Sequence, residues 1–212
     1  MDQRKPTEAV LKQTNGTFAV IPATPAGVVT GDQLAKIAEL VRDGAGIAKF
    51  TTGQRIVILT TSDKVQSVKD GLKEVGLEVG PVGSTIRNIK GCAGRLCKYH
   101  CQDALGDAME LDKLVAGRVM PAPLKVSLSG CRKNCLEAKS NDIGFIGLPN
   151  GYQVYVGGKG GRQMLGQMVR ENVKSEDLPA VLEEILAKYL EVARTRERVS
   201  RVVEMHGLDR FK

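Results

Sequence analysis

Several residue types and patterns are scarce or missing in this sequence of 212 residues. It has no tryptophan and only 4 Phe and 4 Tyr, which argues against the interleaved aromatic platform on which single-stranded nucleic acids stack. No apolar run approaches the roughly 18 residues of a membrane helix. No apolar signal segment follows the charged N-terminus, residues 1–6. A cytoplasmic protein is therefore expected.

Acidic residues are also in deficit, since 31 Lys and Arg stand against 24 Asp and Glu, a net charge of +7. Such an excess serves general solubility, or it attracts anions such as small substrates, an acidic electron carrier or nucleic acid. The basic residues are dispersed and no helix-turn-helix, zinc-finger or RNP-type motif occurs, which disfavours nucleic acid. The glycine fingerprint of flavin and nicotinamide sites, G-x-G-x-x-G after a strand, is absent as well.

Hydrophobic periodicity predicts strands that alternate with helices in the first third of the chain. After a loose polar arm, residues 1–16, the pattern predicts strands at 17–21, 47–50 and 55–59 and amphipathic helices at 31–43 and 62–75. This alternation is typical of a small α/β or ferredoxin-like unit, which we assign to residues 17–81.

A second domain is expected over residues 82–175. Its predicted strands span 85–89, 125–128, 143–148 and 152–156, with two helices near 95–105 and 111–120. Asn150-Gly151 between apolar runs predicts a two-residue hairpin turn. The C-terminal segment, 176–212, is apolar at helical spacing and then rich in Arg and Glu. It is expected either to pack on its own domain or to wrap a partner, with its charged continuation as a solvated face.

The five cysteines form the strongest chemical signal. All fall within 44 residues, and an odd number in a reducing compartment argues against a disulfide framework. Cys131 and Cys135 enclose three residues after Gly130, whose backbone permits close approach to an inorganic cluster. Cys92 and Cys97 supply two further thiolates, which completes the four that an iron–sulfur cluster takes. The alternatives are buried free thiols and a structural zinc site, to whose usual two-to-four-residue spacing Cys92 and Cys97 conform poorly.

Three segments resemble the nitrite/sulfite reductase family. Residues 129–145 match its S-G-C-x3-C signature and the quartet that follows, residues 92–103 are similar to its other cysteine pair, and residues 150–161 resemble its hairpin and glycine loop. The likeness is greatest to small stand-alone sulfite reductases and to the sirohaem region of NADH-linked nitrite reductases. It implies an α+β fold, in which a ferredoxin-like half-domain precedes a mixed α/β domain that binds sirohaem and a [4Fe-4S] cluster.

In that family the last cysteine bridges the cluster and the sirohaem iron, which by motif position is Cys135. Alignment favours Cys97 as the second ligand, although the family spaces its first pair as C-x5-C and this chain encloses only four residues. Cys101 lies four residues beyond Cys97, on the same face if the segment is helical. Ligation by Cys97 and Cys101 in place of Cys92 therefore stays open, with Cys101 as the expected spare thiol.

The resemblance also implies a basic site, because sirohaem carries eight carboxylates and the substrate is an oxyanion. The expected catalytic residues are Arg87, Lys125 and Arg55. Gly53 and Pro123 stand where many family members carry further cations, and Arg55 is expected to compensate for the first. Backbone N–H groups of glycines 157, 158, 160 and 161 are expected to reach anionic oxygens. The cofactor-binding candidates are Arg132, Lys133, Asn134, Gly157, Gly158, Lys159, Gly160 and Arg162.

The function that the resemblance implies is the six-electron reduction of sulfite to sulfide or of nitrite to ammonia. Two other functions remain open at this point: a non-catalytic iron–sulfur electron carrier or redox sensor, and a zinc-stabilised binding module. The expected electron donor is external, either an acidic ferredoxin-type carrier or a reductase subunit. Because the resemblance covers half of a pseudo-two-fold architecture, a homodimer is also expected.

Overall fold

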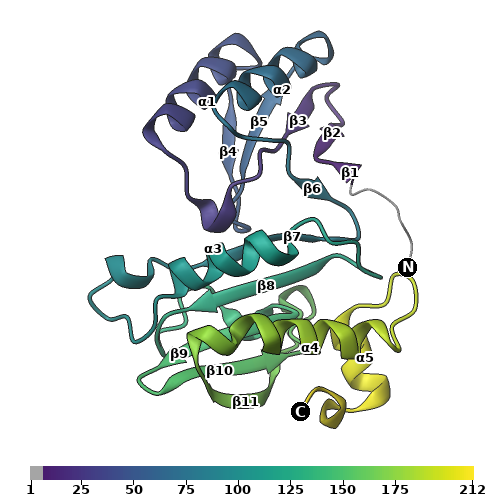
Figure 1. Ribbon diagram of the computed structural model, residues 1–212. Coiled ribbons are helices and arrows are strands. Elements are labelled where there is room, and N and C mark those ends of the chain that lie inside the picture. The colour runs from purple at the N-terminus through teal and green to yellow at the C-terminus, as the bar shows by residue number, and fades with distance from the viewer. Residues whose placement is uncertain (1–6) are drawn as a thin grey trace.

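The computed structural model describes residues 7–212, which build two parts stacked along one axis (Figure 1). The N-terminal part is a four-stranded antiparallel sheet in the order β2-β3-β5-β4. Its elements are β2 Val10–Lys12, β3 Phe18–Val20, α1 Gly31–Asp43, β4 Ala48–Phe50, β5 Ile56–Thr60 and α2 Val65–Glu74. A two-stranded ribbon of β1 Thr7–Glu8 and β6 Pro81–Val82 joins this part to the rest of the chain.

Local sequence explains where these helices begin and how closely they pack. Thr30 caps α1 through a capping box with Gln33, in which each residue's side chain accepts from the other's backbone N–H. Leu40 of α1 lies against Gly71 of α2, where an added Cβ would come within 2.8 Å of the leucine side chain. Glycine at this position therefore lets the two helices approach over the sheet.

The C-terminal part is a five-stranded mixed sheet in the order β11-β10-β9-β8-β7. The strands β7, β8 and β9 run parallel, and β10 and β11 continue the sheet antiparallel. The bounds are β7 Ile86–Gly91, α3 Ala104–Val115, β8 Leu124–Ser129, β9 Ile143–Leu148, β10 Gly151–Val156, β11 Gln167–Val173, α4 Leu178–Leu190 and α5 Val199–His206.

One face of this sheet carries the main core. Ile89, Val126 and Phe145 pack with Leu111 of α3 and Leu182 of α4. Because strand side chains alternate between faces, the neighbours of these residues point the other way. On that second face, Ala138, Ile146 and Tyr155 form a small buried hydrophobic cluster at the turn that follows the second cysteine pair. The second face is therefore the side on which polar side chains of β7 and β8 are available.

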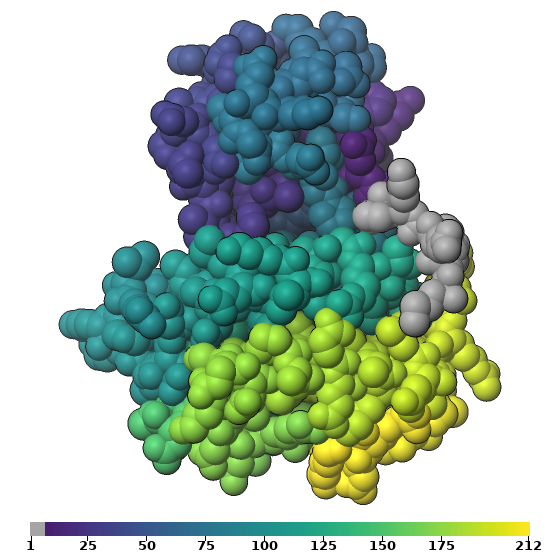
Figure 2. All heavy atoms as spheres, viewed as in Figure 1, coloured from purple at the N-terminus to yellow at the C-terminus, as the bar shows by residue number. Residues whose placement is uncertain are grey.

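Figure 2 shows the N-terminal part resting on the teal segment that contains β7 and α3. Ala26 from the N-terminal part enters the core of the C-terminal part. The Gln54 amide both donates to and accepts from the backbone of Gly91, at 2.8 and 3.0 Å. Asn88 donates to the Gly53 carbonyl at 2.6 Å. These contacts fix the loop 53–55 against the end of β7.

The predicted strands and the first two helices are confirmed, but three expectations are wrong and one strand was missed. Residues 95–120 contain one α-helix, α3, in place of two, since the chain up to Asp103 forms a loop with a short 3-10 turn. The segment 7–12 is not a loose arm, because it pairs with β3 and β6; residues 1–6 lie outside the described part. The two-residue turn of the hairpin is Pro149-Asn150, one position earlier than predicted. Strand β11 was not predicted at all.

The C-terminal segment packs on its own domain, which was one of its two expected placements. Tyr189, Val199 and Phe211 are buried in the core of the C-terminal part. Its charged continuation is not wholly solvated, since Arg198 pairs with the fully buried Asp142 through Nε at 2.9 Å and Nη2 at 2.5 Å. Across residues 7–212, no helix has both the length and the apolar character that crossing a membrane requires.

Candidate functional site

Two cysteines follow directly after neighbouring parallel strands. The last residue pair of β7 and β8 is Gly91 with Leu128, so Cys92 and Cys131 both leave the sheet at its carboxyl edge. The Cys92 N–H donates to the Leu128 carbonyl at 3.1 Å, and the Gly130 N–H donates to the Cys92 Sγ at 3.1 Å. The sheet edge therefore brings Cys92 beside the turn that carries Cys131, at the edge where parallel strands commonly bind ligands.

The loop that carries Cys97 and Cys101 is held against the same turn. The N–H groups of Cys101 and Gln102 both donate to the Gly130 carbonyl, at 2.7 and 3.0 Å. A short 3-10 turn, Gly94–Leu96, precedes this loop, and helix α3 begins only after the Asp103 cap. The expectation that Cys97 and Cys101 share a helical face is therefore wrong, although the choice of ligands stays a prediction.

The turn between the second pair and the sheet is organised by side chains. Asn134 has a left-handed backbone, φ 50°, and its Oδ1 accepts from the Ala138 N–H at 2.8 Å and from the Ser129 hydroxyl at 3.2 Å. Asn141 Nδ2 donates to the Glu137 carbonyl at 2.9 Å. Asn134 thus serves the turn itself, which presents Cys135 at the surface. Binding of a cofactor by Asn134 remains a prediction.

All five cysteines are unpaired thiols. Among residues 7–212, no three Cys, His, Asp or Glu side chains are grouped closely enough to hold one metal ion. A four-iron cluster is much wider than a single ion and keeps its thiolates apart. The chemistry of the donor set fits such a cluster, because thiolates ligate it and backbone N–H groups such as that of Gly130 hydrogen-bond to the sulfurs.

Arg55 and Arg87 are brought together where the two parts of the molecule meet. Arg55 is only 6% exposed, and its Nη2 donates to the Pro81 carbonyl at 3.0 Å. Burial, and next the charge of Arg87, lower the pKa of Arg55 to about 10, so the guanidinium is still cationic at neutral pH. The Nε of Arg87 is buried without a hydrogen-bond partner among the described residues.

A second pair of cations lies on the face of the sheet opposite the main core. Lys90 pairs in register with Ser127 on β8, and Lys125 lies two residues before that serine. Burial, and then the neighbouring Lys125 ammonium, lower the pKa of Lys90, while Glu137 raises it. The Ser127 hydroxyl is fully buried and unpartnered within residues 7–212.

None of these four cations forms a salt bridge with a carboxylate of residues 7–212. Like charges held together with no carboxylate in salt-bridge contact favour the binding of an anion. The arrangement fits a ligand with several carboxylates and a small oxyanion beside it. Lys90 was missed by the sequence analysis. Its signal was a charged residue next to the core residue Ile89, at the end of the strand that delivers Cys92.

The glycine loop makes contacts within the protein that the sequence did not predict, and its role toward an anion stays a prediction. The Gly157 N–H donates to the Asp142 carbonyl at 2.9 Å, so it is not free for an anion. An added Cβ on Gly158 would lie 2.2 Å from the Lys139 carbonyl oxygen and 2.3 Å from that of Asn141. Gly158 is therefore required for packing on the turn that follows the second cysteine pair, while Gly160 remains exposed.

The basic candidates outside the sheet face are spread more widely. Lys133 directs its ammonium to the Tyr99 ring, 4.0 Å from the centroid, and Arg132 is exposed. Lys159 and Arg162 make no side-chain hydrogen bond or ion pair with the other site residues in the described part of the chain. Their N–H groups bond to the Met164 and Lys159 carbonyls at 2.8 and 2.9 Å, which closes the loop on itself.

Two protein-family models match the chain. The model for the nitrite/sulfite reductase ferredoxin-like half domain covers residues 10–75. The model for the nitrite and sulphite reductase 4Fe-4S domain covers residues 82–212. These matches confirm the predicted α+β fold class, with a ferredoxin-like half domain ahead of a domain built on a mixed sheet.

Curated proteins that are similar to this chain include sulfite and nitrite reductases. An assimilatory-type sulfite reductase of Nitratidesulfovibrio vulgaris is 29% identical and aligns over 98% of this chain and 96% of its own length. The nitrite reductase [NAD(P)H] of Bacillus subtilis is 30% identical over 92% of this chain, which spans only 25% of that protein. The sulfite reductase [ferredoxin] 1 of Mycolicibacterium paratuberculosis is 34% identical over 86% of this chain and 36% of its own.

Solved structures agree on the fold. The Mycobacterium tuberculosis NirA protein superposes with a TM-score of 0.79 at 25% identity, covering 100% of this chain and 42% of NirA. The dissimilatory sulfite reductase I superposes with a TM-score of 0.82 over 92% of this chain and 68% of its own. At 16% identity, the second likeness shows the fold alone.

Proposed function

This chain belongs to the nitrite and sulfite reductase family, and from that premise we propose that it reduces sulfite to sulfide, or nitrite to ammonia, by six electrons. One observation carries the proposal. The cysteine loops lie at the carboxyl ends of β7 and β8, and the open face of the same strands carries Lys90 and Lys125, which form no salt bridge within residues 7–212. In this proposal, a redox centre held by thiolates and an anion site share these two strands.

The cofactors of the proposal are a [4Fe-4S] cluster and sirohaem. Cys92, Cys97, Cys131 and Cys135 would hold the cluster, with Cys135 on the sirohaem side. Bound together, the two groups supply single electrons and an iron at which the substrate binds. The carboxylates of sirohaem would need cations and hydrogen-bond donors around them, and we assign this role to the side chains of Arg132, Lys133, Lys159 and Arg162 and to the backbone N–H groups of Gly158 and Gly160.

The protein's own contribution to the chemistry is charge and proton supply. Arg87 offers a buried Nε with an unused donor, and Arg55 behind it reinforces the positive potential. Lys125 adds an exposed ammonium with three donors. These groups neutralise charge on the substrate oxygens and orient the waters that deliver protons as those oxygens leave. Lys90 strengthens the same field from the neighbouring strand.

The external partners are the substrate anion and a separate electron donor. The donor would be an acidic ferredoxin-type carrier or a reductase subunit, since the sequence has no flavin or nicotinamide fingerprint. A second copy of the chain is the remaining proposed partner. The five unpaired thiols support a reducing, cytoplasmic setting.

The test is an absorption spectrum of the purified protein, followed by a measurement of its turnover of sulfite or nitrite. Anaerobically purified protein should contain iron and acid-labile sulfide and show the Soret and red bands of sirohaem. It should also oxidise reduced methyl viologen when sulfite or nitrite is added. An iron–sulfur spectrum without sirohaem bands and without turnover would favour the electron carrier, which the cations missing at Gly53 and Pro123 motivate. A colourless zinc protein would overturn both functions.

A further inference from the structure

Asp142 is a buried carboxylate between the start of β8 and the C-terminal segment, and both of its oxygens are engaged. Oδ2 accepts from the Lys125 N–H at 2.9 Å. Arg198 donates through Nε to Oδ1 at 2.9 Å and through Nη2 to Oδ2 at 2.5 Å. The Asp142 side chain is 0% exposed, whereas that of Arg198 is 21% exposed. This carboxylate therefore connects a residue of the proposed anion site to a segment near the far end of the chain.

Arg198 is held in place by the segment around it. It directly precedes α5, and its carbonyl accepts from the N–H groups of Arg201 and Val202 at 2.9 and 3.1 Å. On its other side, the hydroxyl of the buried Tyr189 donates to the Glu197 carbonyl at 2.5 Å. The guanidinium is thus a fixed counter-ion for the carboxylate.

Two cations act on the Asp142 carboxylate. Burial raises the pKa of Asp142, while the hydrogen bonds and charge of Arg198, and next the N–H and ammonium of Lys125, act in the opposite direction. Within residues 7–212, only Arg198 closes a salt bridge on this carboxylate, and the Lys125 side chain stays exposed. A buried charge that loses its ion-pair partner is strongly unfavourable. Without Arg198, the Lys125 ammonium is therefore the cation that would take its place.

We propose that Arg198 is a positioning residue of the anion site: by neutralising Asp142, it leaves the Lys125 ammonium free to bind the substrate anion. The proposal rests on the proposed function and adds a residue that lies outside the site and acts through Lys125. When Arg198 is replaced, the buried carboxylate draws the ammonium to itself and the anion loses a partner. A purely structural ion pair would instead tie down the C-terminal segment without changing the charge that Lys125 offers.

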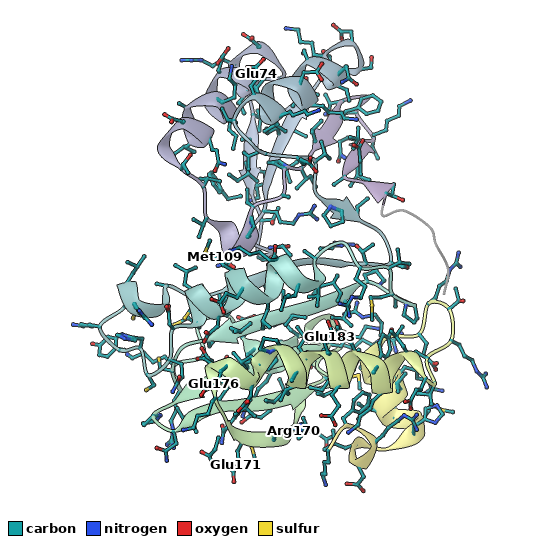
Figure 3. The ribbon with its side chains drawn as sticks, viewed as in Figure 1. Glu74, Met109, Arg170, Glu171, Glu176 and Glu183 are labelled. Carbon is teal, nitrogen blue, oxygen red and sulfur yellow. The ribbon has the colours of Figure 1, made fainter. Side chains whose placement is uncertain are left out.

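The first measurement is the Kd of the holoprotein for sulfite, followed by the change in sirohaem absorption. Arg198→Ala should raise this Kd by about tenfold or more, since a charge-assisted hydrogen bond to the anion is lost. Asp142→Asn/Arg198→Ala also removes the negative charge and should return the Kd to near the parent value. The matched control is Arg170→Ala, which breaks a salt bridge to Glu184 at 2.6 Å and should leave the Kd unchanged. Figure 3 shows Arg170 on β11, the edge strand farthest from β7 in the sheet order.

The second measurement follows the Lys125 amine itself and needs no substrate. Acetylation by acetic anhydride, read out by mass spectrometry, should be slower at Lys125 in Arg198→Ala than in the parent, because pairing with a carboxylate favours the charged, unreactive form. Asp142→Asn/Arg198→Ala should recover the parent rate. In a Lys125→Ala background, adding Arg198→Ala should not raise the Kd for sulfite further, since the group through which Arg198 acts is gone.

The outcomes separate positioning from a structural role. A Kd for sulfite that is unchanged in Arg198→Ala overturns the proposal. So does a double variant, Asp142→Asn/Arg198→Ala, that binds sulfite as weakly as Arg198→Ala, because the pair would then serve the fold alone. If Arg198→Ala does not fold, Arg198→Met keeps the aliphatic bulk and replaces it in each comparison. If the parent binds neither sulfite nor nitrite, the proposed function fails, yet the acetylation rates still decide whether Arg198 keeps the ammonium free.

Discussion

The five thiols differ in what surrounds them, and this difference makes their ligation testable. Cys92 accepts the Gly130 N–H and is partly buried, whereas Cys101 is exposed at the start of the segment leading to α3. We expect Ser replacements at Cys92, Cys97, Cys131 and Cys135 each to abolish or cripple cluster assembly, since a hydroxyl is a poor ligand for the iron.

Cys101→Ser serves as the internal control of this series and should retain the cluster. Iron content and the absorption of anaerobically purified variants give the readout. Full retention in Cys92→Ser combined with loss in Cys101→Ser would transfer the ligand role to Cys101.

The cations of the anion site can be tested one at a time. Arg87→Ala removes the half-buried side chain whose Nε has no hydrogen-bond partner among the described residues, and Lys125→Ala removes the exposed ammonium on β8. Each should raise the barrier for sulfite or nitrite turnover by about 2–4 kcal/mol, the usual effect of losing a preorganised donor. The cofactor spectrum should stay recognisable. Lys73→Ala on α2 is the control, and steady-state kinetics of both site variants that match it would show that the pocket lies elsewhere.

Asp112 is a buried carboxylate away from the anion site. It is 7% exposed and its Oδ1 accepts from the Ile89 N–H at 2.6 Å. Burial raises the pKa of Asp112 to about 6, although that hydrogen bond acts in the opposite direction. The folded protein therefore holds this proton more tightly than the unfolded chain, and the carboxylate destabilises the fold at neutral pH.

A pH series with Asp112→Asn tests this reasoning. Because the pKa is raised on folding, lowering the pH from about 6 to about 4 should stabilise the parent relative to the variant. The difference between their free energies of unfolding should therefore shift in the parent's favour. The gain should be at most about 3 kcal/mol. Urea unfolding followed by far-UV circular dichroism measures it, since the chain has no tryptophan. A parent–variant difference that is flat with pH would mean that Asp112 titrates normally.

At the scale of elements, the sequence predicted those helices and strands whose apolar residues recur at a regular spacing. Strand β9, Ile143–Leu148, was predicted to the residue, because its apolar run is bounded by turn residues on both sides. Two helices, near 95–105 and 111–120, were predicted where the structure has the single helix α3, Ala104–Val115. Two N–H groups of the preceding loop bond to the Gly130 carbonyl, a contact between segments that no local pattern shows. Strand β11 escaped prediction because its residues are largely exposed and polar.

The residues of the candidate site, like the elements of the fold, were predictable only where a short local motif identifies them. Motif spacing identified the cysteines as candidate ligands. The closeness of Arg55 to Arg87, in contrast, depends on how the two parts of the molecule meet. Lys90 depends on the register of β7 with β8. The anion role of the glycine loop stays a prediction, while the packing role of Gly158 depends on a close backbone approach that only the folded chain creates.

The glycine loop offers a matched pair of substitutions. Gly158→Ala should destabilise the protein by roughly 1–3 kcal/mol, because the new Cβ displaces the backbone of the 139–141 turn. At Gly161 an added Cβ meets nothing within 4 Å, so Gly161→Ala should leave stability unchanged. Thermal unfolding of the two variants gives the comparison. If Gly161→Ala lost sirohaem while its stability stayed unchanged, the result would show that the loop binds the anionic cofactor directly.

At the scale of the whole molecule, the N-terminal and C-terminal parts meet at a junction that includes residues of the candidate site, Arg55 and Arg87. The C-terminal segment covers the core of its own part, so it is not available to wrap a partner. The N-terminal sheet, in contrast, ends at the edge strand β4, where Ile47 and Phe50 are 55% and 68% exposed. Exposed apolar residues on an unpaired edge favour contact with another chain. The loop that follows β4 carries Gly53 and Arg55, so a partner there would adjoin the site.

This geometry sharpens the prediction of a homodimer. The chain spans 42% of the mycobacterial NirA protein, so two copies match the length of that larger chain more nearly than one. We expect cofactor-loaded protein at micromolar concentration to scatter light with twice the chain mass of 22.8 kDa. Phe50→Asp should shift it toward the monomer because it places a charge on the edge, whereas Leu165→Asp, at a residue 64% exposed on the other part, should not. A monomer with full activity would show that one copy encloses the site by itself.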